Sequence, residues 1–166
     1  MNELESCPDC GVVLPRVGTG AHAYLGASAS CWALYGEVLA REYGSPSYFR
    51  AHRLTVDAYC AQHPGKPERR TIQSINVHLA GLHAMLDRGF PSDRTRSVIA
   101  VLTAGRAGAF RWLDPPRSLG TICVDSVSAA SDAADRERRV RAWARSVWDA
   151  WADHHDHVAR MVTSVL

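Results

Sequence analysis

The sequence predicts an all-α protein, a single domain over residues 1–166 folded as a bundle of about five helices with a metal-stapled loop at its N-terminus. Several segments carry apolar residues at helical spacing between capping and stop signals. A Cys-Pro-Asp-Cys-Gly motif begins at Cys7, in a region that has too few apolar side chains to order itself. We therefore expect residues 1–30 to form a zinc-knuckle loop and residues 31–166 to form the helical bundle.

Capping and stop signals place the first four helices. Ser30 is a candidate N-cap for the first helix, which Gly44 ends. Ser45 or Ser47 can cap the second, and Gly89 closes the third. The four helices are expected over about 31–44, 47–63 and 70–88, and from 92 or 93 onward.

The C-terminal third is less uniform. The segment 110–116 ends in two prolines, which remove backbone donors, so a loop is expected there. Residues 121–130 fit a short strand or a short helix equally well. From Asp132 a long helix is expected to carry the tryptophans at Trp143, Trp148 and Trp151 and to continue to about Met161.

Composition excludes several classes of function. The apolar fraction of 46% and the charged fraction of 22% are those of a globular chain, and a net charge of +2 is too small for a nucleic-acid-binding surface. The arginines of 136–145 lie close in sequence to Asp132, Asp135 and Glu137, which indicates a solvated helix face. The chain shows no signal peptide and no membrane-spanning run, so we expect a cytoplasmic protein. Lys66 is the sole lysine, a bias typical of GC-rich bacterial genomes.

The cysteines nearest the N-terminus have the spacing of a metal site. Cys7 and Cys10 can present two thiolates to one ion, and Cys31 lies where the first helix is expected to begin. Structural zinc usually has four ligands, and His22 lies between these cysteines in a loop that could fold back. We predict zinc bound by Cys7, Cys10, His22 and Cys31, with His63 as the alternative fourth ligand.

Two other interpretations of the cysteines remain open. Cys10 and Cys31 could simply be buried thiols beside a surface histidine. A redox Cys-x-x-Cys motif fits less well, because that motif normally follows a strand and opens a helix. Cys60 and Cys123 have no partner at metal-ligand spacing, and we interpret both as buried thiols.

A second group of polar residues is expected on the second and third helices. His52, Tyr59 and His63 are spaced to lie along one side of the second helix, with Asp57 beside them. A short turn would bring His78 of an antiparallel third helix alongside. The prediction is that His52, Asp57, Tyr59, His63 and His78 form one catalytic pocket, although any single buried histidine is more often a core residue.

A set of motifs runs along nearly the whole chain and coincides with the groups selected above on chemical grounds. They are the CPxCG start, Gly26–Ser28 with Cys31 and Trp32, His52–Tyr59, Gln62–Gly65, Arg69 and Arg70, Gln73 and Ser74, Val77–Leu79, Trp112 and Leu113, Pro115 and Pro116, and the tryptophans and histidines of 143–155. Together these motifs resemble a family of small bacterial proteins classed as domain of unknown function 5946. The resemblance implies no activity, because no reaction is established for that family.

Three functions are compatible with these residues. The first is a metal-dependent enzyme acting on a small molecule by hydrolytic, lyase or transfer chemistry. Its general base would be His52 or His63, oriented by Asp57, and Tyr59 or Arg70 would stabilise negative charge. The second is a non-catalytic, zinc-stabilised module that uses exposed tryptophans to grip a protein partner. The third is a sensor that uses the clustered cysteines as reactive thiols.

Overall fold

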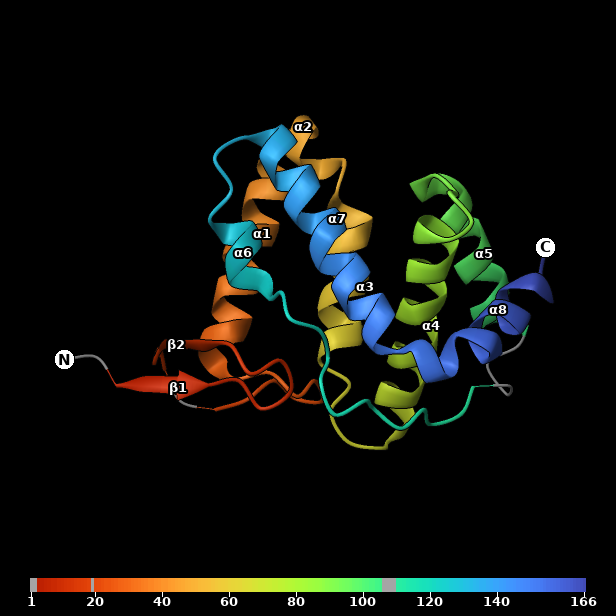
Figure 1. Ribbon diagram of the computed structural model, residues 1–166, viewed down its shortest axis with the longest axis horizontal. Coiled ribbons are helices and arrows are strands. Elements are labelled where there is room, and N and C mark those ends of the chain that lie inside the picture. Colours follow the sequence, from red (N-terminus) through yellow and green to blue (C-terminus); the bar gives the residue numbers. More distant parts are fainter. Residues whose placement is uncertain (1–2, 19, 106–109) are drawn as a thin grey trace.

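The computed structural model describes residues 3–18, 20–105 and 110–166, and within them the protein is mostly helical, as predicted (Figure 1). The first two residues of the expected N-terminal loop lie outside this part of the chain. The elements are β1 (Leu4–Ser6), β2 (Val13–Pro15), α1 (Ala29–Gly44), α2 (Pro46–Phe49), α3 (His52–Gln62), α4 (Arg69–Leu86), α5 (Ser92–Gly105), α6 (Val124–Ser128), α7 (Ala133–Ala150), a 3-10 turn (Ala152–His154) and α8 (His155–Thr163).

The described residues contain more helices than expected because two predicted helices are interrupted. The second is divided into α2 and α3 by a turn at residues 50 and 51. The last one ends at Trp151, where the chain enters the 3-10 turn before α8. The ambiguous segment 121–130 contains the short helix α6, and residues 110–116 form the expected irregular segment.

The N-terminal segment is more ordered than a loop. β1 and β2 pair antiparallel, with Glu5 opposite Leu14, and the Cys-Pro-Asp-Cys-Gly motif lies between them. The N-cap of α1 is Ser28 rather than Ser30, since the Ser28 Oγ accepts a hydrogen bond of 3.2 Å from the Cys31 amide. Ser30 is instead held by Glu5, whose carboxylate accepts its amide at 2.9 Å. These bonds join the hairpin to the start of α1.

The helix α3 lies between α4 and α7 at the centre of the molecule (Figure 1). Trp143, Trp148 and Trp151 are buried against it and α4, with at most 1% of each side chain exposed. Each indole nitrogen donates to a group of the bundle, for example Trp143 to the side chain of Gln62 at 2.9 Å. The sequence left open whether these tryptophans belong to the core or to an interface, and their burial makes them core residues.

In the part of the chain that is described, no helix is long and apolar enough to cross a membrane.

Candidate metal centre and histidine pocket

Four side chains converge where the hairpin meets the ends of α1 and α3. The ligand atoms of Cys7, Cys10, Cys31 and His63 all lie within 4.8 Å of one another. Cys7, Cys31 and His63 are buried, and Cys10 is half-buried. Three sulfurs and one imidazole nitrogen at this separation can hold one metal ion.

The motif itself positions the first two sulfurs. The Cys7 amide donates to the Val12 carbonyl at 2.8 Å, and the Gly11 amide returns to the Cys7 carbonyl at 3.0 Å. Gly11 has a φ of 75°, which a residue with a side chain rarely adopts, so the glycine is needed to close this turn. The Ser28 amide points at the Cys7 Sγ at 3.5 Å and favours its thiolate form.

His63 is oriented for coordination by a bond to its own helix. Its Nδ1 lies 2.7 Å from the Tyr59 carbonyl, which can only accept, so Nδ1 carries the proton. The other ring nitrogen, Nε2, is left as a lone-pair donor and lies 3.5 Å from the Cys31 Sγ. Metal-bound histidines are commonly held in this way, because the second nitrogen fixes both tautomer and ring direction.

The structure places His63 rather than His22 in the cluster. The His22 Nδ1 accepts the amides of Tyr24 and Leu25 at 3.3 and 3.0 Å, and its ring packs edge-on against Trp32. The Nδ1 of His22 is therefore occupied by hydrogen bonds within its own loop. His63 was the alternative fourth ligand in the sequence prediction, and it reaches the cluster from the end of α3. The sequence spacing around the cysteines does not reveal this contact.

The thiols of the cluster influence one another's protonation. Hydrogen bonds from Cys10 and Cys31 hold the pKa of Cys7 far below its ordinary value. Contacts with Cys123, Cys31 and Cys7 raise the pKa of Cys10. Three thiols this close together cannot all ionise without a compensating positive charge, which a divalent ion would supply. Cys123, interpreted from sequence as a partnerless thiol, donates to the Cys10 carbonyl at 3.4 Å.

A separate polar group lies between α3 and α4. The Asp57 carboxylate, with no exposed surface, accepts Arg53 through Nε at 2.7 Å and Nη2 at 2.8 Å. The same carboxylate holds the Nδ1 of His78 at 2.8 Å. A buried carboxylate between a bidentate guanidinium and an imidazole is fully paired, so it can remain ionised in the interior.

Gly81 makes room for this carboxylate. A Cβ built on Gly81 would lie 2.1 Å from the Asp57 Oδ2, far inside any real contact. The close approach of α3 and α4 at this point therefore requires a residue without a side chain.

We expect Gly81→Ala to lower the free energy of unfolding by about 2 kcal/mol, because Asp57 must move away from its partners. Gly36→Ala is the matched control: Gly36 is also inside a helix, and a Cβ there meets nothing within 4 Å. That substitution should be neutral or stabilising by up to about 1 kcal/mol. Urea unfolding of both variants measures the difference, and equal effects would refute the role given to Gly81.

His78 is held in its protonated form. Burial lowers its pKa, but the Cys60 thiol and Asp57 outweigh this effect and raise the pKa to about 10. Cys60 lies almost one helical turn after Asp57 on the same side of α3, beside His78. Near neutral pH His78 is therefore an imidazolium flanked by a carboxylate and a thiol.

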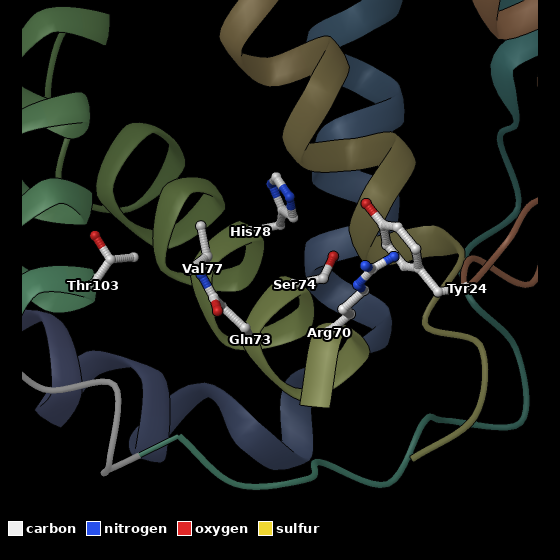
Figure 2. A pocket seen from close by; sticks show the side chains of 7 residues that line it. All are labelled: Tyr24, Arg70, Gln73, Ser74, Val77, His78 and Thr103. Carbon is white, nitrogen blue, oxygen red and sulfur yellow. The ribbon is translucent and has the colours of Figure 1, made fainter. Parts of the chain in front are cut away.

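His78 also lines a cavity of about 450 Å³ that is open to solvent (Figure 2). Figure 2 shows Arg70 and Tyr24 side by side at one edge of this cavity and Val77 with Thr103 at the other. The Arg70 guanidinium lies 5.9 Å from the centre of the Tyr24 ring. The lining is completed by Gln73 and Ser74. An imidazolium and an arginine beside one cavity suit a negatively charged small molecule.

The structure does not bring the five predicted pocket residues together. Asp57 and His78 meet as expected, but Tyr59 donates its hydroxyl to the Cys31 Sγ at the metal centre, beside His63. His52 lies at the opposite end of α3 with Glu42 at 2.7 Å. The reason is geometric, since eleven residues of helix separate positions on one face by about 16 Å along the axis. Their spacing predicted the side of α3 on which these side chains lie, but it did not predict which residues they contact.

The sequence predictions missed or misinterpreted several residues in or near these sites. Arg136, expected on a solvated face, is 1% exposed and reaches Glu42 at 3.3 Å in the bundle interior. Cys60, interpreted as a simple buried thiol, lies beside His78. Arg53 could have been found, because its spacing of four residues from Asp57 is that of a helical ion pair. For Arg136 no local pattern distinguishes it from its exposed neighbours.

One of the three comparisons with known proteins gives a match. A family model described as "Family of unknown function (DUF5946)" matches residues 5–152, which include the cysteine cluster and both residues of the Asp57–His78 pair. No curated protein and no solved structure matches the chain.

Proposed function

Because the chain belongs to this family of unknown function, which supplies no activity, we propose from the site itself that the protein is a zinc-stabilised enzyme acting on a small anionic molecule. Zinc has the structural role. The chemistry takes place at the cavity lined by His78 and Arg70. The observation that carries this proposal is the Asp57–His78 hydrogen bond of 2.8 Å, buried at one end and bordering an open cavity at the other.

Zinc is the metal that best fits the cluster. Thiolates and imidazole together select zinc over magnesium or calcium, which prefer oxygen ligands. Four protein ligands would fill a tetrahedral shell, and three of the four residues are buried. Such a closed shell leaves no position for substrate, which supports a structural ion that joins the hairpin, α1 and the end of α3.

At the cavity, His78 would act as a proton donor and Arg70 as the group that stabilises negative charge. Asp57 positions the imidazole and keeps it protonated near neutral pH, and Arg53 in turn fixes Asp57. A histidine whose pKa is raised to about 10 is a poor general base but remains charged to interact with an anion. His78 thus replaces His52 and His63, the bases suggested by the sequence, since both of these are engaged elsewhere.

The contact of Cys60 with His78 gives the same residues a second candidate chemistry. A thiol beside an imidazole that is oriented by a carboxylate is the arrangement used for nucleophilic catalysis. In acyl transfer the Cys60 thiolate would attack the acyl carbon, and His78 would give its proton to the leaving group. This alternative predicts a covalent acyl-enzyme, whereas acid catalysis by His78 does not.

Two chromogenic probes distinguish these mechanisms. With p-nitrophenyl phosphate or p-nitrophenyl acetate, release of p-nitrophenolate should fall by about 100-fold in His78→Gln and in Arg70→Gln, since each substitution removes a positive charge that stabilises the negative charge developing in the reaction. His154→Gln, a histidine that does not line the cavity, is the control. Loss of activity in Cys60→Ser together with an acetylated Cys60 in the wild-type protein would favour the thiol mechanism. Activity that is absent, or equal in all variants, would contradict an enzymatic role.

A further inference from the structure

A second cavity lies on another side of α3 and borders the Asp57 group through Arg53 alone. Its volume is about 510 Å³, within the range of small-molecule sites. Three arginines reach it from different elements: Arg50 between α2 and α3, Arg53 from α3 and Arg96 from α5. Arg50 and Arg96 are exposed, and the three arginines come from different segments of the chain rather than from one face of a single helix.

The positive charge around this cavity is incompletely balanced. Among the ion pairs of the described residues, neither Arg50 nor Arg96 takes part in one. Arg53 commits Nε and Nη2 to Asp57, and that carboxylate is also claimed by His78. Bringing guanidinium groups together costs electrostatic energy, which an anion within the cavity would offset.

One wall of the cavity is flat and apolar. The ring of Phe49 stacks on that of His52, with centroids 4.6 Å apart and planes inclined by 14°, and Val56 lies beside them. Phe49 is 45% exposed, so one face of this stack is accessible to a ligand. His52 is itself fixed, because its Nδ1 lies 2.7 Å from Glu42 and its Nε2 lies 3.3 Å from the hydroxyl of Tyr43.

We propose that this cavity binds a small molecule in which a phosphate or carboxylate group is attached to a planar ring. The anionic group would lie between Arg50 and Arg96, with the remaining nitrogen of Arg53 below it. The ring would lie against the Phe49–His52 stack. Phosphate and carboxylate each accept two parallel hydrogen bonds from the planar guanidinium group, so the proposal covers both as one ligand chemistry.

Phenyl phosphate, inorganic phosphate and benzoate are the probes that test this site. In NMR titrations of the whole protein, phenyl phosphate should bind at least about tenfold more tightly than inorganic phosphate, because it adds a ring contact. Saturating shifts are expected at Phe49 and His52. If benzoate matches phenyl phosphate, the carboxylate is an equal ligand; if it does not, the site prefers phosphate.

Arginine variants distinguish binding in this cavity from a general electrostatic attraction of anions to the protein. Arg50→Gln and Arg96→Gln should each weaken phenyl phosphate about tenfold, the value of one charge-assisted pair of hydrogen bonds. Arg141→Gln removes the same charge from an exposed position of α7 and should have little effect. Arg70→Gln affects only the other cavity and should leave the shifts at Phe49 and His52 unchanged. Equal loss of the Phe49 and His52 shifts in all four variants, shifts confined to His78, or no saturable binding of any probe would overturn the proposal.

Discussion

Replacing His63 with alanine is expected to release the zinc ion and to lower the melting temperature by roughly 10 °C or more. The substitution removes one of four ligand atoms and leaves three clustered thiols without the charge that would compensate them. The hairpin, the start of α1 and the end of α3 would lose the ion that joins them, so disorder should concentrate in the N-terminal third. Elemental analysis after dialysis and thermal unfolding measure both effects, and Cys31→Ser should behave similarly.

His22→Ala is the discriminating control for this prediction. It removes the only histidine between Cys10 and Cys31, but its ring nitrogen accepts backbone amides in its own loop. The variant should retain about one zinc per chain, with at most a modest loss of stability from the missing contact with Trp32. Zinc retained by His63→Ala and lost from His22→Ala would reverse the ligand assignment. Absence of zinc from the wild-type protein purified without chelator would remove the metal proposal altogether.

The second large effect is expected from Asp57→Asn. This change keeps the size of the side chain but removes the charge that holds Arg53 and His78, leaving two cations close together in the interior. Breaking a buried ion pair by removing one partner costs about 3–5 kcal/mol, and the free energy of unfolding near neutral pH should fall by that order. Asp149→Asn is a suitable control, because Asp149 is also paired with an arginine at a spacing of four residues on a helix but is 62% exposed and should contribute at most about 1 kcal/mol.

The pH dependence of stability provides an independent readout of the same interaction. The pKa of His78 rises from 6.5 to about 10 on folding, so the folded protein binds more protons than the unfolded chain between these values. The stabilisation from His78 is therefore complete below about pH 6.5 and disappears as the pH rises through about 10. In Asp57→Asn this decline should be smaller, because one of the two groups that raise the pKa is lost. A wild-type protein whose stability does not fall over this range would contradict the charged state assigned to His78.

The helical class and the clustering of Cys7 with Cys10 were predictable because their signals are local. Apolar spacing with caps and stops located α1, α4 and α5 to within a few residues. Cys7 and Cys10 belong to one turn of five residues, so local backbone geometry sets their joint direction. The resemblance noted in the sequence is also supported, since a family model of unknown function covers residues 5–152.

By itself, then, the sequence determined the helical class, the three thiols of the candidate metal centre and the face of α3 on which each polar residue lies. Only the tertiary structure decided which of those residues meet. It gave the fourth position of the cluster to His63, 32 residues beyond Cys31, and buried Arg136 against Glu42, 94 residues away. Periodicity fixes the direction of a side chain about a helix axis, but a site also depends on the height of each residue along that axis and on the helix packed opposite. Both depend on how the whole bundle packs.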